Sequence, residues 1–130
     1  MSLCVAATSL IIGLHAVSFH TDTKSGYNNV NPGIYAGYNS YVVGTYYNSD
    51  RKQSVYVGKV FETESCRFDM TVGAVTGYAA PVLPFVIAGV KFDTDQVVKN
   101  SRTRISMMPV IDKNKKFNGM VFHLSIERSF

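Results

Sequence analysis

The chain ends in the stretch GMVFHLSIERSF, residues 119–130, in which apolar and polar side chains alternate. Successive side chains of a β-strand point to opposite faces, so this alternation gives the stretch two faces of different character. One face carries Met120, Phe122, Leu124 and Ile126. The other carries Val121, His123, Ser125 and Glu127. The stretch therefore predicts a strand with one apolar face and one face of small, polar and charged groups.

Two earlier segments divide in the same way when they are read with a period of two. Residues 66–76 set Phe68, Met70, Val72 and Ala74 against Arg67, Asp69, Thr71 and Gly73. Residues 9–20 set Leu10, Ile12, Leu14 and Ala16 against Ile11, Gly13, His15 and Val17. If residues 9–20 form one regular strand, His15 and His20 are expected to point to opposite faces of it.

Apolar segments recur about every dozen residues along the whole chain, separated by Asn, Gly, Asp, Ser and Lys, and no helical period is sustained. This spacing predicts an all-β fold, an eight-stranded antiparallel up-and-down (meander) β-barrel. The expected strands are 9–20, 34–39, 41–48, 54–62, 66–76, 83–92, 104–111 and 119–130.

The length of 130 residues fits a single domain, 1–130. Eight Tyr, eight Phe and 10 Gly with no Trp favour β structure. Residues 1–8 are expected to be either the remnant of a leader or the start of the first strand. Cys4 and Cys66 form no metal-type spacing, and their disulfide state stays open.

The net charge of +4 is modest, and the basic residues gather in predicted turns. These groups are Arg51 and Lys52; Lys99, Arg102 and Arg104; and Lys113, Lys115 and Lys116. We interpret them as solvated turn residues, because no recognition pattern for nucleic acid accompanies them. No nucleic-acid partner and no cofactor is expected. No metal site is expected either, because the three histidines do not share one face of one strand.

A soluble barrel buries its apolar face, whereas a membrane barrel turns that face to lipid and keeps a polar interior. Two features favour the membrane arrangement. The chain ends in Phe130 directly after an alternating strand, and long and short loops alternate along most of the chain. The connection 93–103 breaks this alternation. We therefore expect a bacterial outer-membrane barrel whose stripe at 120–126 faces lipid.

The polar faces of these strands supply the candidate site residues. Inside a barrel, charged groups need partners, so we predict an interior polar network of Arg67, Asp69, His123 and Glu127. At the rim of the longer loops, His15, His20, Asn48 and Ser49 form a candidate catalytic set. A histidine can activate a serine hydroxyl as general base, with an Asn or Asp orienting the ring. The segment 27–33 is rich in turn formers and is predicted to be a rigid loop before the second strand.

The order of several features resembles the lipid A palmitoyltransferases of Gram-negative outer membranes. The features are His15-Ala16, Tyr27-Asn28, Asn48-Ser49, Tyr56-Val57-Gly58, Pro81 with Pro84, Pro109 and Phe130. The resemblance spans residues 13 to 130 and implies an eight-stranded barrel with an interior acyl-chain pocket. It places the serine of that family on Ser49 and its histidine on His15 or His20. The aspartate of that family falls on Asn48, and its N-terminal amphipathic helix has no counterpart here.

The chain is also similar to small uncharacterised proteins of phages and proteobacteria that carry an Asn-Asn-x-Asn-Pro-Gly loop. Two functions therefore remain open. One is an outer-membrane barrel that binds lipid or an acyl chain, with acyl transfer from a phospholipid as its conditional activity. The alternative is a non-enzymatic phage- or bacterium-derived β-domain with a structural or binding role, such as a virion-associated one. A soluble lipocalin-like carrier is a third possibility. The sequence sets no oligomeric state.

Overall fold

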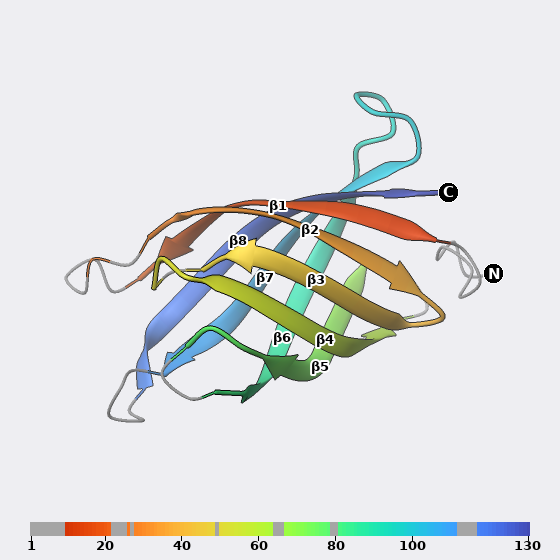
Figure 1. Ribbon diagram of the computed structural model, residues 1–130. Helices are drawn as coiled ribbons and strands as arrows, with labels where there is room; N and C mark the ends of the chain where they lie inside the picture. The colour runs from red at the N-terminus through yellow and green to blue at the C-terminus, as the bar shows by residue number, and fades with distance from the viewer. Residues whose placement is uncertain are drawn as a thin grey trace.

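The computed structural model describes residues 10–21, 26, 28–48, 50–63, 67–78, 81–111 and 117–130. All of its regular elements are strands, and neighbours in sequence pair antiparallel around a closed barrel (Figure 1). The strands are β1 (Ile11–His20), β2 (Val30–Tyr38), β3 (Tyr41–Tyr47), β4 (Gln53–Glu62), β5 (Phe68–Val75), β6 (Leu83–Asp93), β7 (Ser101–Ile111) and β8 (Phe117–Ser129). The predicted eight-stranded meander barrel is confirmed. In the described part of the chain, no helix is long and apolar enough to cross a membrane.

Four strands, β2, β4, β7 and β8, begin earlier than the sequence predicted, β2 and β7 by the most. β2 starts at Val30, so Asn31, Pro32 and Gly33 belong to the strand rather than to the loop before it. Proline has no N–H to donate, but it fits a strand position where the ladder needs no donor. β7 starts at Ser101, so Arg102 and Arg104 are strand residues and not turn residues. The turn prediction for these two arginines is therefore wrong.

The barrel has two unlike ends. The connections β1–β2, β3–β4, β5–β6 and β7–β8 lie at one, which we call the loop end. Leu10 and Phe130 lie at the other, which we call the terminal end, where the Phe130 amide donates to the Leu10 carbonyl at 2.8 Å. The two-residue turn Asn39-Ser40 and the connection 94–100 are also at the terminal end, and the latter projects from the barrel in Figure 1. The expected alternation of long and short loops is therefore only partial.

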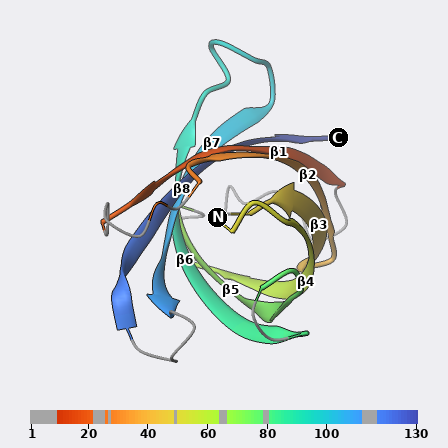
Figure 2. The ribbon, with the colours of Figure 1, turned by 60° about the vertical axis from the view of Figure 1, so that its left-hand side comes forward.

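Closure of the barrel depends on the pairing of β1 with β8, which lie side by side in Figure 2. The register shifts between His15 and Ser18, because β1 carries an extra residue there. Ala16 and Val17 are both exposed at this β-bulge, and the alternation of faces resumes with the opposite parity. A bulge reverses the faces to which the side chains after it point. Ser18 and His20 therefore turn inward together with His15, which corrects the predicted opposite parity of the two histidines.

Burial in this barrel is the reverse of that in a soluble protein. The buried polar and charged side chains include Asn48, Ser54, Asp69, Lys91, Ser125 and Glu127, whereas the buried apolar ones are Tyr35, Val75 and Val121 among the described residues. Large apolar side chains cover the outside instead; Phe122 and Leu124 are each 38% exposed. The predicted orientation of the stretch 119–130, with its apolar stripe outward, is confirmed.

One close contact explains a glycine in the barrel wall. A Cβ atom at Gly73 would lie 2.0 Å from the carbonyl oxygen of Val57 on the neighbouring strand β4. Because that oxygen belongs to the backbone, the two strands would have to separate to admit a methyl group. At Gly37 the nearest atom, the carbonyl oxygen of Tyr41, is 3.5 Å from such a Cβ, which is ordinary contact.

We expect Gly73→Ala to lower the free energy of unfolding by about 1–3 kcal/mol, the usual range for overpacking. The matched variant Gly37→Ala should change it by less than about 0.5 kcal/mol. Urea unfolding followed by far-ultraviolet circular dichroism measures both values. Equal stability of the two variants would contradict the close approach of β4 and β5.

Candidate functional site

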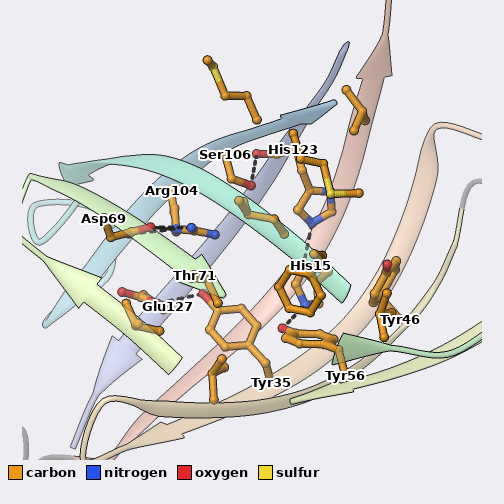
Figure 3. A pocket seen from close by; sticks show the side chains of 18 of the residues that line it. His15, Tyr35, Tyr46, Tyr56, Asp69, Thr71, Arg104, Ser106, His123 and Glu127 are labelled. Atoms are coloured by element: carbon orange, nitrogen blue, oxygen red, sulfur yellow. Dashed lines mark hydrogen bonds and ion pairs between the residues drawn. The ribbon is translucent and has the colours of Figure 1, made fainter. Parts of the chain in front are cut away.

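The lumen contains a cavity of about 140 Å³, whose lining is shown in Figure 3. All eight strands contribute side chains to its walls, so no single strand forms it. Aromatic and aliphatic side chains line the part toward the loop end: Tyr46, Tyr56, Val75, Tyr78, Phe85, Met108 and Val121. Charged side chains line the part toward the terminal end: Asp69, Lys91, Arg104 and Glu127. The cavity therefore has one apolar half and one ionic half.

Asp69 anchors the ionic half. Arg104 reaches across the lumen from β7 and donates from its Nε to both carboxylate oxygens of Asp69, at 3.0 and 3.2 Å, and from a terminal nitrogen as well. The Nζ of Lys91 lies 3.5 Å from the same carboxylate and 2.9 Å from Oε1 of Glu62. These contacts join β4, β5, β6 and β7 through side chains as well as through the sheet.

Glu127 extends this network to β8 and β2. Its Oε2 accepts a hydrogen bond of 2.8 Å from the hydroxyl of Tyr35, and its Oε1 accepts one of 2.9 Å from Arg102. Lys91 lies 3.5 Å from the same Oε1. Three cationic and three anionic side chains thus meet near the terminal end, and their formal charges cancel. The predicted network did not include the lumen residues Lys91, Arg102, Arg104 and Glu62. The alternation of polar and apolar side chains in residues 102–107 could have indicated that Arg102 and Arg104 lie on an inward strand face.

A second hydrogen-bonded group crosses the middle of the lumen. His15 Nδ1 lies 2.8 Å from His123 Nε2, and His15 Nε2 lies 2.8 Å from the Tyr56 hydroxyl (Figure 3). On the far side of His123, its Nδ1 lies 2.8 Å from Oγ of Ser18. Ser18, His123, His15 and Tyr56 therefore form one continuous chain, which we call the lumen relay. The closing of β1 against β8 brings the two histidines together, although they are 108 residues apart in sequence.

The members of the predicted catalytic set that the structure describes are His15, His20 and Asn48. His15 belongs to the lumen relay, whereas His20 is buried near the loop end with its Nδ1 2.6 Å from Oδ1 of Asn29. Asn48 is 0% exposed, and its amide group donates to Ser54 Oγ and the Gly77 carbonyl, both at 2.8 Å. Its Oδ1 accepts from two backbone amides of the turn that follows. These bonds give Asn48 a structural role, and Ser49 lies outside the described residues.

The predicted polar network overlaps only in part with the observed one. Asp69 and Glu127 are buried among cations, and His123 lies in the lumen relay. Arg67, in contrast, has an exposed side chain, because it precedes β5 at the open end of the barrel. The sequence paired Asp69 with Arg67 since both lie on one strand face, but the partner that the fold supplies is Arg104. Cys4 and Cys66 are outside the described residues.

Within the described ranges, no group of three or more His, Cys, Asp or Glu side chains is placed to hold a metal ion. What the lumen offers is a hydroxyl beside an imidazole, a second imidazole behind it, and an adjoining apolar space. The arrangement suits proton transfer and the binding of a small apolar group. Comparisons of the chain with protein-family models, curated proteins and solved structures found no match.

Removal of the charge of Asp69 should destabilise the barrel, because Arg104 and Lys91 would be left in the lumen without their shared counter-charge. We expect Asp69→Asn to lower the free energy of unfolding by about 3 kcal/mol, at the lower end for a broken buried pair. Asp50→Asn makes the same chemical change at an exposed turn position and should have little effect. Urea titration compares the two; equal losses would show that the pairing of Asp69 contributes no stability.

Proposed function

We propose that this chain is a barrel of the outer-membrane type that lies in a lipid bilayer and binds lipid or an acyl chain through its lumen. The observation that carries the proposal is the reversed burial, with polar groups paired inside and apolar groups outside. In water, an apolar exterior of this extent is unfavourable, because burial of apolar surface is the main favourable contribution to folding. Against hydrocarbon the same exterior is stable.

The distribution of charge on the outside supports a lipid-facing band. At outward-facing strand positions within the described ranges, the charged side chains are Lys59 and Arg128. Both lie near the terminal end and both contact aromatic rings. The Nζ of Lys59 is 5.6 Å from the ring centroid of Tyr41 and 5.5 Å from that of Phe61, and Arg128 lies over Phe130. A cation in this setting extends its apolar stem along the wall and keeps its charge at the interface.

Exposed aromatic side chains also gather at the terminal end. They are Tyr38, Tyr41, Phe61, Phe68, Phe92 and Phe130. Phe19 and Tyr47 are the counterparts near the loop end. Two aromatic girdles that flank an apolar band are typical of barrels in outer membranes, where the rings lie at the level of the lipid headgroups. This arrangement favours a bilayer over a protein partner, because a partner would cover one side of the barrel and not its whole circumference.

Val57 provides a test of the lipid-facing band. It lies at the middle of β4 and is 55% exposed. In a bilayer, Val57→Arg should lower the free energy of unfolding by about 2–4 kcal/mol, because it places a charge near the hydrocarbon midplane. Gln96→Arg, in the exposed connection 94–100, is the matched control and should be close to neutral. Urea unfolding in phosphatidylglycerol vesicles gives both values. A wild-type chain that folds and stays dissolved without detergent or lipid would contradict the proposal.

The size of the cavity limits what the lumen can hold. A cavity of about 150 Å³ accommodates a benzene molecule, so 140 Å³ admits about six carbon atoms. The lumen therefore suits the end of an acyl chain, or a ring of similar size, rather than a whole fatty-acyl chain. The apolar half of the cavity would take this group, with the hydroxyls of Tyr46 and Tyr78 paired to each other at 2.7 Å beside it.

A pair of variants on β5 tests this binding mode. Val75 is buried and lines the cavity, whereas Val72 faces outward on the same strand. Val75→Phe should abolish saturable binding of hexanol to the detergent-solubilised barrel, because the larger ring fills the cavity. Val72→Phe should leave binding unchanged. Chemical-shift titration of the lumen tyrosines measures both, and equal hexanol binding by the two variants would show that the cavity is not the site.

A further inference from the structure

The β-bulge in β1 has a chemical result as well as a structural one. Without the extra residue at Ala16-Val17, Ser18 would share the outward face of Leu10, Ile12 and Leu14. With it, Ser18 turns into the lumen, and its Oγ lies 2.8 Å from Nδ1 of His123. A serine hydroxyl at hydrogen-bond distance from an imidazole, with a third group behind that imidazole, is the arrangement that activates a nucleophile.

The hydrogen bonds of the lumen relay have a consistent direction for this chemistry. If Ser18 donates to His123 Nδ1, then His123 carries its proton on Nε2 and donates it to His15 Nδ1. His15 in turn carries its proton on Nε2 and donates it to the hydroxyl oxygen of Tyr56. Each ring then holds one proton, so both histidines are neutral, and the free lone pair of His123 faces the serine.

We propose that Ser18 is the nucleophile of an ester-cleaving acyl-transfer site, with His123 as its general base and His15 as a positioning residue. The inference rests on the proposed function in one respect, since the acyl group would occupy the lumen cavity. Ser18, His123 and His15 are linked to one another by hydrogen bonds. The substrate class is a carboxylic ester whose acyl group, or the end of it, fits a space of about six carbon atoms.

Ser18 does not itself line the cavity, but its Oγ lies 2.8 Å from Nδ1 of His123, which does. His15 and His123 line the cavity wall, and the cavity extends to Val121, which pairs with His20 across β1 and β8. Ser18 lies between these levels, because it pairs with His123. An acyl group held among Tyr56, Phe85 and Val75 would therefore meet Ser18 with its carbonyl carbon toward the loop end, at the part of the cavity wall that His123 forms. The alcohol part of the ester would extend out of the lumen at that end.

The reaction needs no reagent other than the ester and an acceptor hydroxyl. Oγ of Ser18 attacks the carbonyl carbon while its proton passes to Nδ1 of His123. The bond from the carbonyl carbon to the alcohol oxygen breaks, and the alcohol leaves with the proton from His123. The acyl group is then an ester of Ser18. Water or a second alcohol attacks it, gives its proton to His123, and the serine hydroxyl forms again when that proton returns.

The test uses the full chain in detergent micelles with p-nitrophenyl hexanoate as the probe. We expect release of p-nitrophenolate and a hexanoyl mass increment on Ser18 in tandem mass spectrometry. Ser18→Ala should lose the adduct and reduce release to the rate without protein, and His123→Gln should reduce it by about 100-fold or more. Ser125→Ala, a buried lumen serine outside the relay and the cavity lining, is the matched control and should keep the wild-type rate.

Two further measurements separate chemistry from folding. His15→Gln should shift the pH profile of the acylation rate, an effect that a purely structural role would not produce. Val75→Phe should slow cleavage of the hexanoyl ester more than that of the acetyl ester, because it narrows the cavity. The folded state of each variant is checked by its electrophoretic mobility without heating.

The outcomes distinguish this inference from the proposed function. A barrel that inserts into vesicles and binds hexanol, but forms no adduct on Ser18, would overturn the nucleophile and leave the lipid-binding proposal intact. An adduct on Ser18 in a chain that does not enter vesicles would support the nucleophile and contradict the membrane proposal. Release by Ser18→Ala at the wild-type rate would also overturn the assignment.

Discussion

The pairing of β1 with β8 is the constraint on which the rest of the structure depends. It closes the sheet, so that neither end strand is left with a row of unpaired N–H and C=O groups. It also sets His15 against His123, two residues from opposite ends of the chain, and so creates the lumen relay. The extra residue that this pairing accommodates turns Ser18 and His20 inward. The closed sheet, the lumen relay and the inward direction of Ser18 and His20 therefore all follow from the pairing of β1 with β8.

A polar lumen imposes a second constraint, because charged groups taken out of water are stable only with partners. The barrel meets it by separating two kinds of interior. Near the terminal end, ionic contacts around Asp69, Lys91 and Glu127 link strands on opposite sides. Toward the loop end, aromatic rings pack edge to face, such as Tyr56 with Tyr46 and with Phe85. The ionic part links strands through their side chains, and the aromatic part borders a small cavity that the two histidines of the lumen relay also line.

Period-two alternation was sufficient to predict the strands and the meander, because alternation is a local consequence of side-chain direction. The outward direction of the apolar face of β8 needed two further features, the terminal Phe130 and the lengths of the loops. The bulge in β1 was not predictable, since it is defined only by the register of β1 against β8. The same limit applies to Asp69: its sequence neighbour Arg67 lies on the same face, but its partner Arg104 comes from a strand that only the closed barrel brings near. Arg102 and Arg104 were assigned to a turn because the polar run before them hid the start of β7.

The balance of charge near the terminal end has a consequence for transport. Lys91, Arg102 and Arg104 face Glu62, Asp69 and Glu127, so the formal charges of these six side chains cancel. An ion that entered from the loop end would have to displace contacts already made between side chains before it could pass. A transmembrane voltage does no net work on a neutral layer that stays in place. In a bilayer, the setting proposed above, this paired layer would oppose the passage of ions through the lumen.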